Sequence, residues 1–356
     1  MSLRWRRFGG MNADVSKIGS VHTAPQQGTD VLRVFELRKS FPVPRRPSEW
    51  LRFEPASRAV AVDDVSFAVS RGEILGIVGE SGSGKSTLAR CLLGLEVPDS
   101  GAIRFWDGLL DPTDKQSLHK LRSRVQIVFQ DPYAALNPRM RVGDAIAEAA
   151  RFHRSVANEG VDGFVDELLG LVGLPPDVKA RRPRQLSGGQ RQRVVIARAL
   201  AVRPEILVAD EAVSALDVSV QAQILNLLRN LQEELGLTII LISHQLSVIS
   251  YLCRRVAVMY LGKIVEYGTV ESVFTSPQHP YTRALLDAHP DPDPRHARLS
   301  PTIRDAETEA EKVGGCVFQR RCQYAEARCH ESEPTLEPVD ATSAAACFVR
   351  PFRDTA

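Results

Sequence analysis

The sequence predicts an α/β fold built on a parallel sheet, and three observations carry that prediction. The apolar run Ile74–Val78 is followed by a glycine-rich turn and a helical pattern, the usual order of a strand, its loop and its crossover helix. Two further apolar runs, Ile206–Ala209 and Ile239–Ile242, are continuous rather than alternating, as expected of parallel strands covered on both faces. Residues 140–200 instead have helical spacing, so we expect a helical subdomain that interrupts the strands.

The composition is that of an ordinary globular protein, with 44% hydrophobic and 25% charged residues among 356. Lys and Arg number 45 against 43 Asp and Glu, and a net charge of +2 gives no basic field that would argue for nucleic acid. The longest apolar runs, such as Thr238–Ile242, are far below the roughly 18 residues that a membrane span requires. No long apolar stretch follows Arg4, Arg6 and Arg7, so we expect no secretory signal.

Other elements follow from local patterns. Residues 1–30 lack periodicity and are expected to form a flexible tail, with Met11 as an alternative start. Alternating or short buried apolar runs predict three more strands: Val31–Leu37, Ala61–Val69 and Val125–Phe129. Prolines and arginines between residues 42 and 58 indicate an irregular surface insertion. From Gly268 onward the pattern breaks into Pro-rich segments and a cysteine-rich end.

The glycine-rich turn Gly79–Thr87 has the pattern G-x-x-x-x-G-K-[ST], between the strand and the helix that this pattern requires. Its backbone N–H groups and the helix N-terminus can cradle phosphate oxygens. Lys85 can reach the β- and γ-phosphates, and the Ser86 hydroxyl can ligate Mg²⁺. The alternative is a chance glycine-rich turn, which the flanking strand and helix argue against. We therefore expect a nucleoside triphosphate site.

Two carboxylates, Asp210 and Glu211, end the apolar run Ile206–Ala209. Beside the phosphate loop, Asp210 would hold Mg²⁺ through water, and Glu211 would polarise the attacking water as a general base. An acidic pair after a strand is common by itself, so this assignment depends on the loop.

The segment Leu186–Gln190 is the most specific motif in the chain. A serine hydroxyl and two glycine N–H groups at a helix start form a second anion-binding surface. Because one chain already has a phosphate loop, we expect this surface to face another nucleotide. The plain alternative is a Gly-Gly turn before a helix.

In this order the motifs resemble those of the ATP-binding-cassette (ABC) ATPases. The resemblance covers roughly residues 31–267 and implies a RecA-like parallel-sheet core, an antiparallel β part and a helical signature subdomain at about 131–200. It implies that the chain binds ATP and Mg²⁺ and hydrolyses ATP. It also divides the chain into a tail at 1–30, an ABC ATPase domain at 31–267 and a C-terminal extension at 268–356.

The resemblance also assigns roles position by position. Gln130 is similar to the residue that senses Mg²⁺ and the lytic water while touching the membrane partner, and His244 resembles the switch histidine at the γ-phosphate. Taken singly, the first could be a surface amide and the second a satisfied histidine at a strand end. Asp217 falls in the loop that contacts the partner across the dimer, and Phe41 falls where the family stacks an aromatic ring on adenine. The implied catalytic residues are Lys85, Gln130, Glu211 and His244. The implied ATP-binding residues are Phe41, Gly79, Ser81, Gly82, Ser83, Gly84, Lys85, Ser86, Thr87, Gln130, Ser187, Gly188, Gly189, Gln190, Asp217 and His244. The implied Mg²⁺ site consists of Ser86, Gln130 and Asp210.

Local matches narrow the family to oligopeptide and dipeptide importers. The segments that resemble theirs are Gln130–Arg139, Val258–Glu266 and His279–Leu286. Gln190 and the sequence of Val213–Asp217 resemble the corresponding residues in the second of the two ATPase subunits of such importers. Gln245 and Ala135 replace a usual aspartate and serine, and Ala212 replaces a proline, which could loosen the turn that places the preceding glutamate.

The function implied is ATP binding and hydrolysis that powers a peptide importer from the cytoplasmic face of the membrane, as a peripheral subunit. Its partners would be a second ABC ATPase chain in a heterodimer, two transmembrane permeases and an extracytoplasmic substrate-binding protein, with no nucleic acid. One alternative is the ATPase of a nickel or other small-solute importer, or an exporter half. Another is a non-transport ABC protein, although such proteins usually carry two cassettes or a long helical arm.

Four of the six cysteines, Cys316, Cys322, Cys329 and Cys347, lie near the C-terminus. In a chain that uses ATP we expect reduced thiols rather than disulfides. Spacings of five, six and seventeen intervening residues lack a C-x₂-C knuckle. Four thiolates can hold Zn²⁺ or a [4Fe–4S] cluster, and free thiols in a folded tail are the plain alternative. Because Gly315–Cys322 resembles the cysteine-bearing tail of peptide-importer ATPases, we expect a structural cluster, far from the phosphates.

Overall fold

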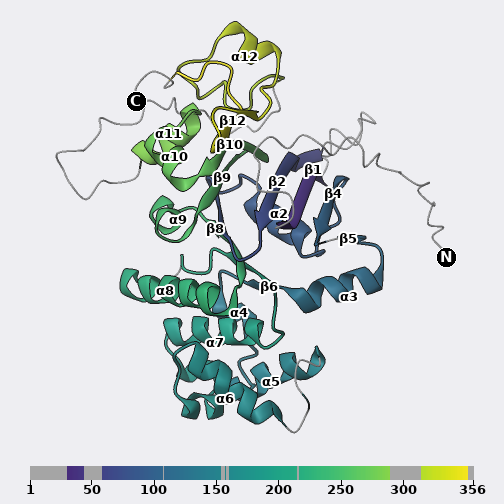
Figure 1. The fold of residues 1–356 in the computed structure, drawn as a ribbon, viewed down its shortest axis with the longest axis vertical. Coiled ribbons are helices and arrows are strands. Elements are labelled where there is room, and N and C mark those ends of the chain that lie inside the picture. Colours follow the sequence, from purple (N-terminus) through teal and green to yellow (C-terminus); the bar gives the residue numbers. More distant parts are fainter. Residues whose placement is uncertain are drawn as a thin grey trace.

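The structure is a computed structural model. It describes residues 30–43, 58–106, 108–153, 157, 160–214, 216–288 and 314–351. Figure 1 shows an elongated molecule with two sheets in its middle, helices α5 (Val142–Phe152), α6 (Val161–Leu171) and α7 (Gly188–Leu200) at one end, and the cysteine-rich segment with α12 (Ala327–Glu331) at the other.

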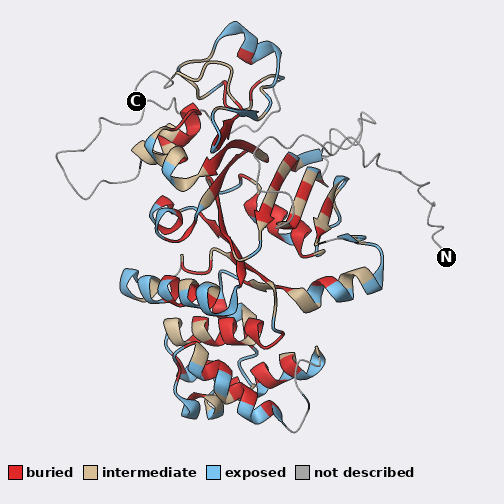
Figure 2. Ribbon diagram, viewed as in Figure 1, coloured by how far each residue is buried: buried red, intermediate tan, exposed pale blue. Residues whose placement is uncertain are grey.

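The larger sheet combines parallel strands with an antiparallel edge. Its order is β11-β12-β10-β9-β3-β8-β7-β6. The bounds are β3 Ile74–Val78, β6 Val125–Val128, β7 Ile206–Asp210, β8 Thr238–Ser243, β9 Arg255–Tyr260, β10 Lys263–Thr269, β11 Glu337–Pro338 and β12 Ser343–Ala345. Neighbours from β9 to β6 run parallel. Every residue of β3 and β8 is buried, as the central strands in Figure 2 show, which confirms the prediction from their continuous apolar runs.

The two faces of this sheet are covered by different layers because successive side chains of a strand point to opposite sides. Ile239 and Leu241 of β8 share a core with α9 (Leu246–Leu252) and α8 (Val218–Leu235). Ile240 and Ile242 instead share a core with α2 (Lys85–Leu92) and the second sheet.

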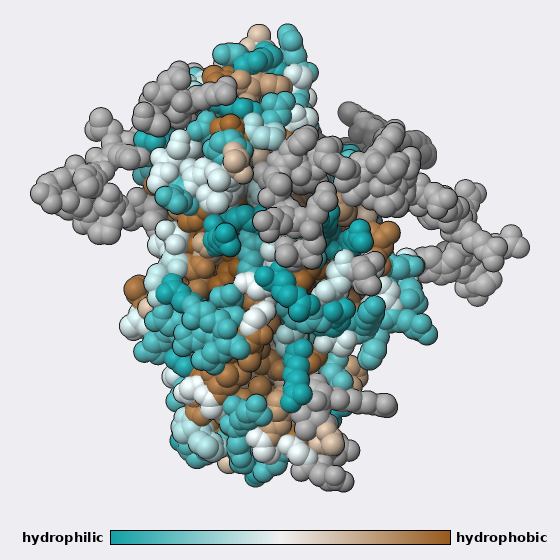
Figure 3. Space-filling view, in the orientation of Figure 1, coloured by the Kyte–Doolittle hydropathy of each residue, from teal (hydrophilic) through white to brown (hydrophobic). Residues whose placement is uncertain are grey.

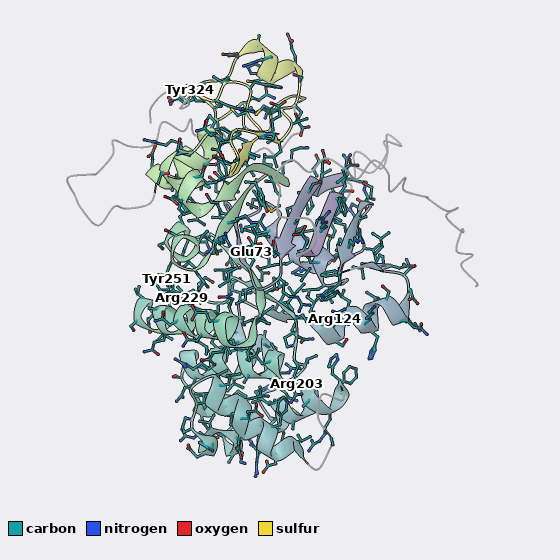
Figure 4. The ribbon with its side chains drawn as sticks, in the orientation of Figure 1. Glu73, Arg124, Arg203, Arg229, Tyr251 and Tyr324 are labelled. Atoms are coloured by element: carbon teal, nitrogen blue, oxygen red, sulfur yellow. The ribbon has the colours of Figure 1, made fainter. Side chains whose placement is uncertain are left out.

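The second sheet is antiparallel throughout, in the order β2-β1-β4-β5. Its strands are β1 Asp30–Pro42, β2 Arg58–Ser70, β4 Ser100–Phe105 and β5 Gly108–Leu109, and helix α3 (Lys115–Arg124) follows β5. The predicted strands Val31–Leu37 and Ala61–Val69 lie inside β1 and β2. Arg255 of β9 connects the two sheets. It makes an ion pair with Glu73, near the centre of Figure 4, and its Nη2 also donates to the Ala68 carbonyl of β2.

The predicted helical stretch is confirmed. Besides α5, α6 and α7, residues 140–200 contain the 3₁₀ turns η3 (Pro176–Ala180) and η4 (Pro183–Gln185), and the short helix α4 (Pro132–Ala135) precedes them. The residues predicted to share one helical face are all buried: Phe164, Val165, Leu168, Leu169 and Val172. They belong to the same core as the face of the larger sheet that α8 and α9 cover. The helical part therefore packs on the sheet through α7 and α8.

The C-terminal extension is built into the larger sheet. Helices α10 (Val270–Thr275) and α11 (Pro280–Asp287) follow β10, and β12 then pairs antiparallel with β10, with Gly268 opposite Ser343. The predicted boundary between residues 267 and 268 therefore falls inside β10. The predicted tail lies outside the described residues except for Asp30, which begins β1, and residues 44–57 of the predicted insertion also lie outside them. Among the helices described, none is long and apolar enough to cross a membrane.

Candidate functional site

The phosphate loop has the predicted context, between the end of β3 and the start of α2. Two of its glycines are required by close backbone neighbours. A Cβ on Gly79 would lie 2.1 Å from the Met259 carbonyl oxygen, and one on Gly84 would lie 2.0 Å from that of Ala61. Gly84 also has φ of +102°, a left-handed conformation that favours glycine. The loop therefore packs closely between the backbones of β9 and β2.

Lys85 is the first residue of α2 and is buried. Its Nζ donates to the carbonyl oxygens of Gly79 and Glu80, both at 2.8 Å, and to Ser83 Oγ at 3.3 Å. Burial lowers the pKa of Lys85, although nearby carboxylates oppose the shift. The amine is thus folded into the loop, where phosphate oxygens can replace the two carbonyls as its acceptors.

Asp210 ends β7 and faces the start of α2. Its Oδ1 accepts a hydrogen bond from Ser86 Oγ at 3.3 Å. Burial raises the pKa of Asp210, which is the expected effect on a carboxylate that has lost water and gained few donors. A hydroxyl and a carboxylate are ligands that Mg²⁺ accepts, so this pair fits the ion.

Glu211 and His244 meet because they follow the neighbouring parallel strands β7 and β8. His244 Nδ1 lies 3.4 Å from Glu211 Oε1. Glu211 has a left-handed φ of +48°, and its N–H donates to the Ile242 carbonyl at 3.0 Å. This left-handed conformation ends the extended strand at Glu211 and lets its carboxylate lie near the histidine.

Gln130 lies two residues beyond β6 and reaches the same edge. Its Nε2 donates to Ser214 Oγ at 3.3 Å, and that hydroxyl donates to the Glu211 carbonyl at 3.0 Å. The Ser214 N–H bonds to the same carbonyl. The turn after Glu211 is therefore closed by Ser214, although Ala212 stands where proline is usual. Sequence reasoning gave Ser214 no role, and only its place in the predicted dimer loop could have singled it out.

The segment Leu186–Gln190 forms the start of α7. Ser187 and Gln190 make a reciprocal cap, since Ser187 Oγ accepts from the Gln190 N–H at 3.2 Å and Gln190 Oε1 accepts from the Ser187 N–H at 3.0 Å. Gly189 packs on α8, where an added Cβ would lie 2.5 Å from a methyl group of Val220. Ser187 is exposed, and no hydrogen bond or ion pair among the described residues joins this segment to the phosphate loop.

Asp217 and Phe41 lie at the edges of this arrangement. Asp217 is exposed at the N-terminus of α8, beside Leu216, which packs near Gly188. Phe41 is on β1 opposite Ala59, two residues from the Ala61 carbonyl that touches the phosphate loop. Asp217 therefore lies beside the α7 surface, and Phe41 lies on the sheet that flanks the loop.

The cysteine-rich segment gathers four of the six cysteines. Cys316, Cys322, Cys329 and Cys347 line one cavity. Among the described residues, no group of three or more His, Cys, Asp or Glu side chains is arranged to hold a metal ion. The segment nevertheless contacts the phosphate loop, because Arg321, next to Cys322, makes an ion pair with Glu80. The expectation that a cluster at the cysteines lies far from the phosphates stays a prediction.

The chain matches two known families by sequence. Residues 62–214 match the ABC transporter family, and residues 265–329 match the C-terminal region of oligopeptide/dipeptide transporters. A protein of Sinorhizobium fredii, named as a peptide ABC transporter ATP-binding protein, is 46% identical over 327 residues, which is 90% of each chain. The chain belongs to the ATP-binding proteins of ABC transporters.

Further comparisons agree with this family. A peptide import ATP-binding protein of Brucella abortus is 47% identical over 312 residues, 87% of this chain and 91% of that one. Among solved structures, cbiO1 of Clostridium perfringens, part of an ABC transporter complex, has a TM-score of 0.60 and 30% identity, covering 69% of this chain and 91% of its own. A dimeric ATP-binding cassette with ADP and phosphate has a TM-score of 0.59 and 27% identity, covering 67% and 98%. The chain is thus an ABC-type ATPase that uses ATP and Mg²⁺.

Proposed function

We propose that this ABC ATPase powers a peptide importer, and that ATP is hydrolysed at the edge where β7 and β8 end. The observation that carries the site is the convergence of Asp210, Glu211, His244 and Gln130, from three strands, beside the phosphate loop. The names of the relatives and the matched C-terminal region support peptides as the cargo.

In this proposal the loop residues Gly79–Thr87 bind the phosphates, and Lys85 moves from its carbonyl acceptors to the β- and γ-phosphate oxygens. Ser86 and Asp210, with Gln130, hold Mg²⁺, which neutralises charge that develops on the phosphates. Phe41 stacks on the adenine. Each assignment uses a group that already lies at the loop or on the strands that flank it.

Glu211 acts as the general base. It orients the attacking water and takes its proton while the water oxygen bonds to the γ-phosphorus and the bond to the β-phosphate oxygen breaks. His244, 3.4 Å from Glu211, contacts the γ-phosphate. Gln130, hydrogen-bonded to Ser214, couples the occupancy of the site to the surface of the chain.

The segment Leu186–Gln190, in which Ser187 is exposed, is proposed to cover the nucleotide of a second ATPase chain. It has backbone N–H groups at the N-terminus of α7, a suitable anion site, and among the residues that the structure describes no hydrogen bond or ion pair joins it to the phosphate loop of its own chain. Asp217 beside it would lie at the same interface. The dimeric state of a solved structural neighbour supports such pairing, and we propose a distinct second chain as the partner.

A surface next to Gln130 is proposed to contact the two permease subunits, which would place the chain at the cytoplasmic face of the membrane. Phe129 and Tyr133 flank this glutamine and are 43% and 61% exposed. Hydrophobic residues also gather on the surface near α4 and α7 in Figure 3. An exposed apolar patch of this kind suits a protein partner.

The test of the peptide assignment is purification of the tagged chain with its partners from membranes in mild detergent. We expect a second ABC ATPase, two permeases and a substrate-binding protein whose bound ligand is a short peptide. A binding protein loaded with nickel or another small solute would replace the peptide assignment, and recovery with ribosomes or DNA but without permeases would refute transport.

The four cysteines are proposed to hold a [4Fe–4S] cluster, with Zn²⁺ as the alternative. The support is that all four line one cavity. Burial raises the pKa of Cys316 and Cys322, so a bound metal would have to stabilise their thiolates. Purification without oxygen should give brown protein with about four iron atoms per chain. One zinc per chain would support the alternative, and metal-free protein would leave four free thiols.

A further inference from the structure

The second residue of the phosphate loop, Glu80, is held by groups that are distant in sequence. Its N–H donates to Tyr281 Oη at 2.9 Å. Its carboxylate accepts two hydrogen bonds from Arg321, at 2.8 Å from Nη1 and 3.0 Å from Nη2. Its carbonyl accepts Lys85 Nζ at 2.8 Å. The backbone and side chain of Glu80 are therefore fixed from the C-terminal extension, while its carbonyl holds the lysine that serves the phosphates.

The two anchoring residues are themselves held by one aromatic cluster. Tyr281 of α11 is fully buried, with its ring centroid 4.5 Å from that of Tyr260 and 5.6 Å from that of Phe318. The Arg321 guanidinium lies 5.7 Å and 5.8 Å from the centroids of the latter two rings. Because Tyr260 ends β9, next to the carbonyl that packs on Gly79, the cluster ties the loop, the sheet and the extension into one unit.

This arrangement affects phosphate binding in two ways. Glu80 places a negative charge on a loop that must receive a triphosphate, and the paired guanidinium of Arg321 offsets that charge. The bond from Tyr281 also fixes the Glu80 peptide group, so the loop can stay open when Lys85 leaves the Glu80 carbonyl for the phosphates. A preorganised loop loses less conformational entropy when the nucleotide binds.

We propose that the C-terminal extension positions the phosphate loop, with Arg321 and Tyr281 as positioning residues that act through Glu80 on ATP affinity. The inference rests on the proposed role of the loop in phosphate binding. It gives the extension a function in the ATPase cycle that is independent of any metal at the cysteines.

The first experiment measures the Kd of the full chain for Mg²⁺-ATP. The Arg321 side chain is 21% exposed and that of Glu80 40%, so we expect Arg321→Ala to raise Kd by about fivefold, as suits a bidentate but partly solvated pair. Arg320→Ala is the matched control, because Arg320 is exposed and makes no ion pair with the described part of the chain. It should bind ATP as the wild type does. A wild-type Kd for Arg321→Ala would overturn the proposal.

A double-mutant cycle tests whether the effect passes through Glu80. In a Glu80→Ala background, Arg321→Ala should change Kd no further. Equal effects of Arg321→Ala with and without Glu80 would show that the arginine acts elsewhere and would overturn the proposal. Arg321→Lys keeps the positive charge but not the bidentate hydrogen bonds of the guanidinium, so its affinity for ATP should lie between those of Arg321→Ala and the wild type.

Two further variants separate positioning from folding and from the proposed function. Tyr281→Phe keeps the buried ring and removes only the acceptor for the Glu80 N–H, so it should raise Kd. If it lowers the melting temperature of nucleotide-free protein but leaves Kd unchanged, its role is only structural. Lys85→Ala should abolish ATP binding, and if it does not, the phosphate-loop assignment fails. If Lys85→Ala loses binding but Arg321→Ala and Tyr281→Phe bind ATP normally, only the positioning role is refuted.

Discussion

The residues of the proposed hydrolytic site come together because parallel strands bring their carboxyl ends to one edge. Asp210 and Glu211 end β7, and His244 follows β8, its neighbour in the sheet. From the sequence, Asp210 and Glu211 were expected beside the phosphate loop because they follow an apolar run, whereas the place of His244 was implied only by the resemblance to ABC ATPases. The sequence did not predict Ser214, which links Gln130 to Glu211, because a serine in a turn has no pattern that distinguishes it.

Asp210 gives a prediction on magnesium and pH. Burial raises its pKa, so protons compete with Mg²⁺ at a higher pH than at an ordinary aspartate. We expect the Mg²⁺ dependence of ATP binding to weaken as the pH falls, and Asp210→Asn to lose most Mg²⁺ affinity at every pH.

Mg²⁺ titrations of ATP binding at a series of pH values provide the measurement. Asp111→Asn, at an exposed carboxyl in the turn before α3, is the control and should titrate as the wild type does. If Asp210→Asn keeps the wild-type response to Mg²⁺, the aspartate is not a ligand.

At the scale of elements, the strands and the helical stretch were predictable, whereas the place of the C-terminal extension was not. Apolar runs and helical spacing are local signals, and β3, β8 and α6 follow them. The pairing of β12 with β10 and the contact of Arg321 with Glu80 join residues far apart in the chain. No local pattern encodes such pairings, so the extension was expected to stand apart.

The junction of β10 and β12 can be tested at Gly268. A Cβ there would lie 2.7 Å from the Thr342 carbonyl oxygen and 2.9 Å from Ser343 Cα, both backbone atoms that cannot move alone. We expect Gly268→Ala to lower the free energy of unfolding by about 1–3 kcal/mol and to increase hydrogen exchange in β12.

Denaturant unfolding and amide exchange measure these effects. Gly163→Ala is the matched control, since nothing lies within 4 Å of its added Cβ in α6, and it should be neutral or slightly stabilising. Unchanged stability and exchange in Gly268→Ala would mean that β12 does not pair with β10 in solution.

At the scale of the whole molecule, one chain has a phosphate loop and a second candidate anion-binding surface, and no hydrogen bond or ion pair between described residues joins the two. The phosphate loop lies between the sheets, whereas Ser187 is exposed at the start of α7. This separation is the physical reason to propose a composite site shared by two chains.

Ser187→Arg tests the composite site. The bulky cation should block closure over the partner's nucleotide but leave the phosphate loop of its own chain able to bind ATP. We expect an unchanged Kd for ATP and a loss of most ATPase activity in the assembled transporter. A chain shown to be monomeric by sedimentation that hydrolyses ATP at the full rate would rule out the composite site.

The central claim, that hydrolysis at Glu211 powers import, is tested most directly by Glu211→Gln in the transporter reconstituted in vesicles with its binding protein. The amide cannot accept a proton from water, so ATP should still bind while both ATP hydrolysis and peptide uptake fall by at least about a hundredfold. The nucleotide should remain trapped in a closed dimer. Hydrolysis and uptake within a few-fold of the wild type would contradict the account.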